Sequence, residues 1–233
     1  MIILKKSQAF AHGNHREVYK HPDNPKRCLK LMTEHWKDSP RWQRANILGK
    51  IFRPHTYFNE NESEYQFSKA TKKKIGTHAA DFIAIAHGYV ESDRGQVLEV
   101  DLITDYNGET SLSLKEFIWR YGLTKPCETA IEKFWTQLHE HWVFVQARPD
   151  NLSIKELDDG SLQIFAIDGY AYTQFIPLAK WFLKEKNRKL AKFKRNQQLQ
   201  IDHILAARES GNCLLYTSPS PRDQRGSRMP SSA

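Results

Sequence analysis

The stretch AHGNHREVYKHPDNPKRCLKLM, residues 11–32, decides the fold of this 233-residue chain. Two turn-like segments, AHGNH and HPDNP, separate the apolar runs EVY at 17–19 and RCLKLM at 27–32, and residues 2–10 before them are also rich in apolar side chains. Gly, Pro, Asn and Asp punctuate turns, whereas short apolar runs between them favour strands. We therefore predict an antiparallel meander of three strands, the first at residues 2–10.

The rest of the chain alternates between helical and extended patterns. Residues 60–74 begin with acids and end with lysines, a polarity that suits a helix dipole. Apolar spacing predicts strands at 82–90 and 96–103, helices at 111–122 and 128–142, a hairpin of 151–157 and 162–168, and a long helix at about 177–208. This order predicts an α+β domain over 1–212, with an N-lobe of about 1–105, a C-lobe of about 106–211, and a boundary near 105–111.

Composition limits the class of protein. Hydrophobic residues make up 39% and aromatic residues 12% of the chain, which is typical of a globular protein and excludes a disordered one. The chain has no run of about 18 apolar residues, and its start, MIILKKSQAF, lacks the apolar core of a signal peptide. We expect a cytoplasmic protein. The spacing of Cys28, Cys127 and Cys213 suits neither a zinc site nor a disulfide framework.

The last segment, CLLYTSPSPRDQRGSRMPSSA at 213–233, resembles a translated sequencing adapter. CLLYTSPSPRD is similar to one reading frame of a transposon-derived adapter, and SRMPSSA is similar to a translated flow-cell primer. We exclude this segment from the fold as a disordered tail and expect the genuine chain to continue beyond about residue 211. Without it the net charge falls from +8 to about +6. A genuine Ser- and Pro-rich tail is the alternative.

Candidate residues for chemistry lie on the predicted elements. Lys30 interrupts the apolar run CLKLM, and because an unpaired buried ammonium is costly it should face a cleft or solvent. Glu64 and Glu60 share one face of the helix at 60–74. Asp168 follows a strand in FAIDGY. Taken singly, each has an ordinary alternative: an exposed strand lysine, a solvated acidic helix start, and a turn after a strand.

Four pieces in this order carry a resemblance to a known family: GNHREVY at 13–19 with HPDNPKRCLKL at 21–31, ESEYQF at 62–67, TDYNGETSLSLKEFI at 104–118 and RPDNLSI at 148–154. Together they resemble, over roughly residues 7–190, the YrbL family of bacterial kinase-like proteins, which is associated with the PhoP magnesium-response regulon. The resemblance implies a two-lobed protein-kinase-like fold, with a five-stranded antiparallel N-lobe that holds one helix and a short, mainly helical C-lobe.

The resemblance also implies ATP and Mg2+ as cofactors. Lys30 would pair with the nucleotide phosphates and with Glu64, while Asn151 and Asp168 would hold the metal. Asn151 and Asp168 are 17 positions apart, a slightly longer spacing than usual for this fold. Magnesium binds through few protein ligands, so one amide and one carboxylate suffice.

The turn before the second strand departs from the kinase pattern. It holds one glycine, Gly13, where a phosphate-covering loop needs several. Side chains could replace the missing backbone contacts, because Arg16 can donate two hydrogen bonds to a phosphate. We therefore assign Gly13 and Arg16, with Lys30 and Glu64, to cofactor binding. A plain polar hairpin is the alternative.

The segment that resembles a catalytic loop lacks one important residue. Gln146 stands five positions before Asn151, where a kinase carries its substrate-orienting aspartate, and Phe144 replaces the histidine. An amide can orient a hydroxyl but does not take up its proton. We assign Gln146 and Arg148 as candidate catalytic residues. Slow, altered or absent phosphoryl transfer is expected, as in a pseudokinase or an atypical phosphotransferase.

The short C-lobe restricts the partner. Residues 169–211 give only 43 genuine residues after Asp168, too few for the helices that form the peptide-binding surface of a protein kinase. A small-molecule, glycan or protein partner fits better than a peptide substrate.

A basic stretch supports a second hypothesis. Residues 180–195, KWFLKEKNRKLAKFKR, hold eight Lys or Arg and one Glu, interleaved with aromatic and aliphatic residues. Such a helix attracts an anionic membrane or glycolipid surface, or nucleic acid. The protein would then be a binding module with a vestigial cleft. A solvated helix that covers the C-lobe, with lysine stems packed on aromatics, is the ordinary alternative.

Overall fold

The computed structural model describes residues 1–4, 8–13, 15–33, 42, 47, 58–170 and 183–211. The adapter-like tail at 213–233, with Cys213, lies outside these residues, as does the start of the basic stretch at 180–182.

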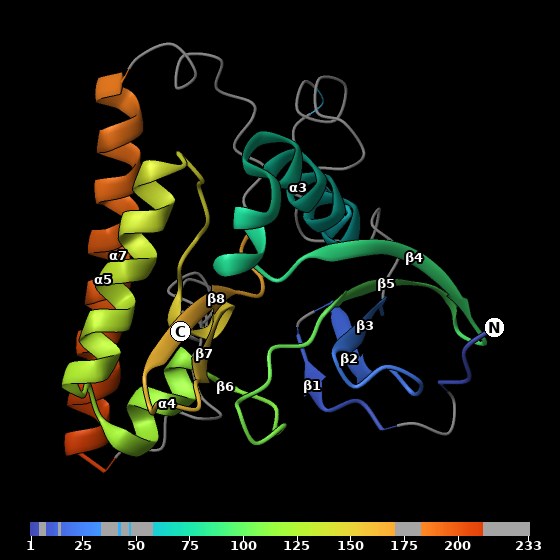
Figure 1. Ribbon diagram of the computed structural model, residues 1–233, viewed down its shortest axis with the longest axis horizontal. Helices are drawn as coiled ribbons and strands as arrows, with labels where there is room; N and C mark the ends of the chain where they lie inside the picture. The colour runs from blue at the N-terminus through green and yellow to red at the C-terminus, as the bar shows by residue number, and fades with distance from the viewer. Residues whose placement is uncertain are drawn as a thin grey trace, which may run out of the picture.

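The N-lobe is a five-stranded antiparallel sheet in the order β1-β2-β3-β5-β4 (Figure 1). Its strands are β1 Ala11–His12, β2 Arg16–Lys20, β3 Arg27–Met32, β4 Ala86–Ser92 and β5 Gly95–Asp101. Helix α3, Glu60–Ile75, lies between β3 and β4 in the sequence and is followed directly by a 3-10 helix, η3 Gly76–Asp81. The predicted α+β class and the five-stranded antiparallel sheet are confirmed, and α3 is a helix at the place in the chain where the prediction puts one.

The prediction of a first strand at residues 2–10 is wrong for the residues that the structure describes there. The first strand is β1, inside the segment predicted as a turn, and Ile2 makes only an isolated bridge to Ser92. Leu4 is nevertheless 1% exposed, and its N–H donates to Asp93 Oδ1 at 2.7 Å. Leu4 belongs to a buried cluster with Leu29, Leu31 and Val97 of the sheet, so the apolar character of this segment reflects burial and not strand pairing.

Side-chain caps set where the C-lobe helices begin. Ser113 and Glu116 form a reciprocal capping box at the start of α4, Leu114–Tyr121, so this helix starts later than predicted. The residues before it form a short strand, β6 Leu112–Ser113. Helix α5, Lys125–Glu140, starts earlier than predicted because Thr124 caps it.

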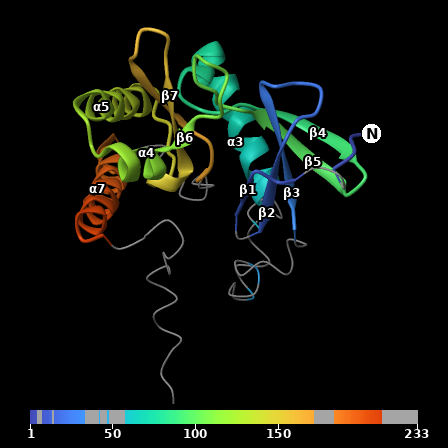
Figure 2. The same cartoon turned by 90° about the horizontal axis from the view of Figure 1, so that it is seen from below.

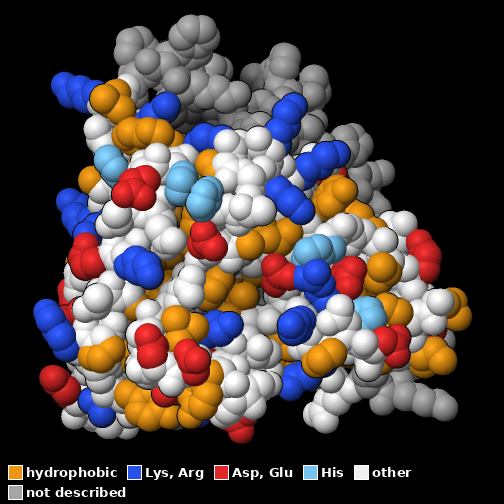
Figure 3. Space-filling view, viewed as in Figure 1, with side chains coloured by type: hydrophobic (Ala, Val, Ile, Leu, Met, Phe, Trp, Pro, Cys, Tyr) orange, Lys and Arg blue, Asp and Glu red, His pale blue; other side chains and the backbone are white. Residues whose placement is uncertain are grey.

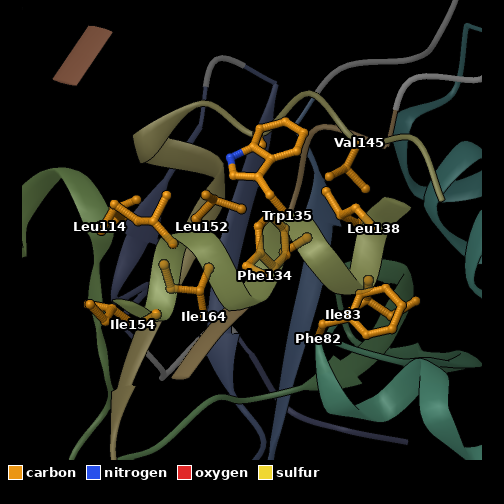
Figure 4. Packing of buried hydrophobic residues seen from close by; sticks show 14 of the residues in the cluster. Phe82, Ile83, Leu114, Phe134, Trp135, Leu138, Val145, Leu152, Ile154 and Ile164 are labelled. Atoms are coloured by element: carbon orange, nitrogen blue, oxygen red, sulfur yellow. The ribbon is translucent and has the colours of Figure 1, made fainter. Parts of the chain in front are cut away.

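Among its described residues, the C-lobe combines a small sheet with the helices α4, α5 and α7. Strands β7, Leu152–Glu156, and β8, Leu162–Ala166, form the predicted hairpin, and β6 extends it to the order β6-β7-β8. Helix α7, Leu183–Glu209, agrees with the described part of the predicted long helix. Figure 4 shows the core that α4, α5 and the sheet share, with Phe82, Ile83, Leu114, Phe134, Trp135, Leu138, Val145, Leu152, Ile154 and Ile164 labelled.

Helix α7 lies alongside α5 and α4 and closes this core (Figures 1 and 2). Leu190, Ile201 and Ile204 are buried against it, and Trp135 Nε1 donates to Gln197 Oε1 at 2.7 Å. Among helices of the described residues, none has the apolar length that crossing a bilayer demands. A cytoplasmic location stays a prediction, and so does the exact lobe boundary.

The two lobes are joined through the end of β8. Ala166 accepts a backbone hydrogen bond from Ala84 and donates one to Phe82, at 2.8 and 2.9 Å. The hydroxyl of Tyr170 donates to Ala166 O at 2.7 Å and to Ala84 O at 3.3 Å. Both lobes thus hold the segment 167–170 in place, and this segment carries Asp168.

Candidate functional site

Lys30 forms a buried ion pair across the N-lobe. It lies on β3, and its Nζ is 2.6 Å from Glu64 Oε1 on α3. The same Nζ donates to the backbone oxygen of Ile167, in the C-lobe, at 2.7 Å. Lys30 is 6% exposed and Glu64 is 1% exposed. The strand therefore points this lysine into the junction between the lobes, which excludes the exposed-lysine alternative.

The start of α3 supplies more of the site than Glu64. Asn59 caps the helix through the N–H of Glu62, so the first turn is fixed. Asn61, 1% exposed, donates from Nδ2 to the backbone oxygen of Lys30 at 2.9 Å. The structure places Glu64, rather than Glu60, at the Lys30 ammonium. Sequence reasoning missed Asn61, although it follows Glu60 and lies three residues before Glu64.

Arg16 connects three carboxylates. Its Nη1 lies 2.6 Å from Glu64 Oε2, and its Nε lies 3.5 Å from Glu60 Oε2. Its Nη2 donates a hydrogen bond to Asp168 Oδ2. Nη1 also lies 3.4 Å from the side-chain oxygen of Asn61. Burial lowers the pKa of this guanidinium, but the charges of Asp168, Glu64 and Glu60 raise it by more. Arg16 therefore carries a permanent positive charge inside the site.

Asn151 and Asp168 lie together, as a shared metal site would need. The backbone oxygen of Asn151 accepts the N–H groups of Ile167 and Asp168, at 2.9 and 3.3 Å. Its side-chain Nδ2 donates to the backbone oxygen of Gln146 at 3.0 Å. This orientation leaves Asn151 Oδ1 as the side-chain atom that a metal can use. The hairpin β7–β8 thus brings residues 167 and 168, which follow it, back to the turn that precedes it, η4 Pro149–Asn151.

Asp168 is an ionised carboxylate with strong local support. Desolvation raises its pKa, but the charges of Arg16 and Lys30 and the Gly169 N–H lower it by more, to about 2. The Gly169 N–H donates to Oδ1 at 2.6 Å, while Oδ2 binds Arg16. The side chain is 47% exposed, so it lies at the edge of the buried network and remains reachable from solvent.

The oxygen donors fit a magnesium ion. Within the described residues, no group of three or more His, Cys, Asp or Glu could hold a metal. Magnesium needs only one or two carboxylates or amides when phosphate and water oxygens complete its shell. Asp168 and Asn151 present such donors, and the guanidinium of Arg16 already occupies one side of the carboxylate as a stand-in cation.

The two residues assigned to catalysis lie at the rim. Gln146 is exposed, and its backbone N–H donates to Gly169 O at 2.8 Å. Arg148 is also exposed and binds Asp150 through two hydrogen bonds of 3.0 and 2.9 Å. Asp150 is therefore engaged by its neighbour, and the catalytic roles of Gln146 and Arg148 stay predictions.

The position of Gly13 leaves room for a larger residue. The Gly13 N–H donates to Arg16 O at 2.7 Å. A Cβ at Gly13 would lie 3.6 Å from that oxygen, a normal contact, so this position does not demand glycine. The contact of Gly13 with a cofactor stays a prediction.

The two described cysteines are not reactive thiols. Burial raises the pKa of Cys28 to about 11 and that of Cys127 to about 12. Both side chains are buried and free, so neither forms a thiolate at neutral pH.

Comparison with known proteins gives a family match over most of the chain. The profile of the family described as PhoP regulatory network protein YrbL matches residues 2–199. Two curated relatives, each named "Uncharacterized protein YrbL", come from Escherichia coli (strain K12) and Shigella flexneri. Each is 24% identical over 188 residues, which cover 78% of this chain and 79% of the relative.

Solved structures of WbdD show a distant similarity. A high-resolution crystal structure of WbdD matches with a TM-score of 0.40 and 13% identity, and covers 94% of this chain. A co-crystal structure of WbdD with the kinase inhibitor LY294002 matches with a TM-score of 0.36 and 15% identity, and covers 95% of this chain. The chain spans about half the length of the WbdD chains, since 48% of each is covered.

Gly169→Ala should displace the loop that holds Asn151. Gly169 has a φ of +76°, and an added Cβ would lie 2.6 Å from the backbone oxygen of Gln146 and against the side-chain amide of Asn151. Gly160→Ala is the matched control, because its φ of +75° imposes similar strain with nothing within 4 Å. We expect Gly169→Ala to lower the free energy of unfolding by roughly 1–3 kcal/mol more than the control. Equal losses in urea unfolding would contradict this close packing.

The carboxylate of Asp168 should make stability depend on pH in acid. Its folded pKa of about 2 lies below the value of about 3.9 for an unfolded aspartate. The stabilising contribution is therefore complete above about pH 4 and is lost as the pH falls toward 2. Asp168→Asn should flatten the pH dependence of the free energy of unfolding between about pH 4 and 2. Parallel curves for the two proteins in urea titrations would refute the assignment.

Proposed function

The chain belongs to the family of PhoP regulatory network protein YrbL, and we propose that it binds ATP together with Mg2+ at the junction of its two lobes. The observation that carries this proposal is the buried ion pair between Lys30 on β3 and Glu64 on α3. A lysine on the third strand paired with a glutamate of the following helix is the arrangement that holds nucleotide phosphates in kinases.

The energetic cost of the network supports a functional role. Burying two cations and their carboxylates removes them from water, and such pairs are often no more stable than apolar replacements. Lys30, Arg16 and Glu64 nevertheless take up the centre of the interface between β3, β2 and α3. A ligand that uses these charges would explain why the core at this point is ionic.

The balance of charge favours a nucleotide that arrives with its metal. Arg16 and Lys30 face Glu60, Glu64 and Asp168, so the site has one more negative than positive charge. A free polyphosphate would be repelled, whereas Mg2+ would neutralise both its phosphates and the carboxylate. Lys30 would orient the phosphates, and Asn151 and Asp168 would hold the metal.

The site is less well equipped for phosphoryl transfer than for nucleotide binding. Gln146 takes the place of the aspartate that accepts the substrate hydroxyl proton, and an amide can only orient that hydroxyl. A positioned general base contributes about 10²–10⁴-fold to a rate. We therefore propose a pseudokinase, or an atypical phosphotransferase acting slowly on a small-molecule or glycan acceptor, linked to magnesium-responsive regulation.

Mg-ATP should stabilise the full chain in a magnesium-dependent way. At 100 times its dissociation constant a ligand adds about 2.7 kcal/mol, which raises the Tm by a few degrees. Lys30→Met and Asp168→Asn should abolish this shift because they remove the phosphate contact and the metal ligand. Lys26→Met, at an exposed position of the β2–β3 turn, should keep it. If the folded wild-type protein shows no shift in differential scanning fluorimetry, the proposal is wrong.

A second candidate function rests on a cluster of cations over aromatic rings, which we call the basic face: Lys74, Lys186, Lys189, Trp142 and Phe144. Lys186 Nζ lies 5.2 Å from the centre of the Trp142 ring, and Lys189 Nζ lies 4.9 Å from that of Phe144. Lys74 donates to the backbone oxygens of His141 and Trp142, at 2.5 and 3.1 Å.

The basic face gathers positive charge that the described residues leave uncompensated. Burial, and after it the charge of Lys186, lowers the pKa of Lys74. None of the three lysines forms an ion pair with a carboxylate of the described residues. Figure 3 shows further Lys and Arg side chains along the edge formed by α5 and α7, at the left of the view, with Asp and Glu side chains among them. This surface would suit an anionic membrane or glycolipid.

Neutralising the basic stretch should weaken binding to anionic vesicles. We expect the full chain to bind phosphatidylglycerol vesicles with an affinity that falls as salt rises. Replacing Lys186, Arg188, Lys189 and Lys192 by Gln should remove most of this binding, whereas replacing the exposed Lys20, Lys26, Lys125 and Lys133 should not. Equal binding by both variants would exclude the basic face, and stronger binding to RNA than to vesicles would favour nucleic acid instead.

A further inference from the structure

Arg16 binds the two lobes to each other at the proposed metal site. It starts β2 and is 5% exposed, yet its two terminal nitrogens reach carboxylates 48 and 152 residues away in the chain. Glu64 belongs to the N-lobe helix α3, and Asp168 follows β8 of the C-lobe. One guanidinium thus joins the element that anchors Lys30 to the residue that would bind the metal.

Both oxygens of the Asp168 carboxylate already have hydrogen-bond donors. Oδ1 accepts the Gly169 N–H at 2.6 Å, and Oδ2 accepts Arg16 Nη2. A divalent cation that used Oδ2 would have to take the place of the guanidinium. The two cations would otherwise lie within a few ångströms of each other, where like charges repel strongly in a partly buried site.

The remaining contacts of Arg16 do not depend on Asp168. Nη1 lies 2.6 Å from Glu64 Oε2, and Nε lies 3.5 Å from Glu60 Oε2. Because the guanidinium is planar and rigid, it releases Asp168 only by turning as a unit, and Glu64 and Glu60 of α3 remain beside it to balance its charge. After release, the N–H groups of Nη2 would be available to donate to a phosphate oxygen.

We propose that Arg16 is a built-in competitor of the metal: it neutralises Asp168 in the metal-free protein and must leave that carboxylate before a divalent cation binds there. This inference rests on the proposed function, because it takes Asp168 as a metal ligand. Metal entry then breaks a contact between the lobes, and Arg16 determines the concentration of divalent cation at which the site fills.

The geometry of the side chain makes a sharp test available. An arginine fork spans two carboxylates on different elements, whereas a lysine ammonium is a single point of charge. Arg16→Lys keeps a positive charge beside Glu64 but cannot hold Asp168 at the same time. The variant should therefore free the metal position without leaving Glu64 and Glu60 short of a cation.

The experiment is a titration of the full chain with Mn2+ in the absence of nucleotide, followed by electron paramagnetic resonance of the free ion. We expect Arg16→Lys to lower the dissociation constant for Mn2+ by about tenfold, as loss of one charge-assisted contact would. Asp168→Asn combined with Arg16→Lys should remove this gain. Arg94→Lys, which alters an arginine paired with Glu17 in the same sheet, should leave the affinity unchanged.

An unchanged or weaker affinity in folded Arg16→Lys would overturn the inference, and so would an absence of Mn2+ binding in both proteins. If Arg16→Lys does not fold, the nitrogen signals of the Arg16 guanidinium in the wild-type protein decide instead. They should shift with the same midpoint as the Asp168 carboxyl signal when Mg2+ is added, and a guanidinium unaffected by saturating Mg2+ would contradict the proposal.

Nucleotide binding is measured separately, so the two proposals fail in different ways. A gain in Mn2+ affinity without any binding of ATP supports the competitor role of Arg16 and rejects the nucleotide. Magnesium-dependent binding of ATP with equal Mn2+ affinities in wild type and Arg16→Lys rejects the competitor role alone.

Discussion

The carboxylate of Glu64 is the constraint on which the site depends. One oxygen binds Lys30 and the other binds Arg16, each at 2.6 Å, and the residue is 1% exposed. Removing this carboxylate would leave two cations without their partner in the same buried space. Loss of one partner of a buried ion pair costs about 3–5 kcal/mol of stability. The pairing register of β2 and β3 must therefore fit the position of α3, because each of the three elements places one charged side chain in this network.

The C-lobe meets this point through backbone geometry. Ala166 exchanges hydrogen bonds with residues 82 and 84, and the next residue offers its carbonyl oxygen to Lys30. Gly169 then turns the chain back toward Gln146 and Asn151, which no residue with a Cβ can do without moving them. The position of Asp168 is thus determined by a sheet edge and a glycine, and its charge by Arg16.

Two factors would control how much magnesium binds to such a site: the phosphate-bearing ligand and Arg16. In the part of the chain that the structure describes, no group of three or more His, Cys, Asp or Glu could hold a metal. If Asp168 and Asn151 hold the ion as proposed, a phosphate-bearing ligand and water would have to complete its shell. Competition with Arg16 would weaken metal binding in the absence of that ligand. The affinity for the metal alone would then be low, and a nucleotide bound beside it would raise that affinity.

Local signals made much of this protein predictable from its sequence alone. Turn residues and apolar spacing predicted the hairpin β7–β8, the helices and most strands, because caps, turns and periodicity act over a few residues. The error at residues 2–10 arose because apolar side chains report burial and not backbone pairing. Lys30 and Asp168 stood out by their places in strand patterns, whereas only the resemblance to the YrbL family chose Glu64 over Glu60 and added Asn151. The tertiary structure alone decided that Arg16 lies between Glu64 and Asp168, since ion pairs between residues 48 and 152 positions apart arise only when the folded lobes meet.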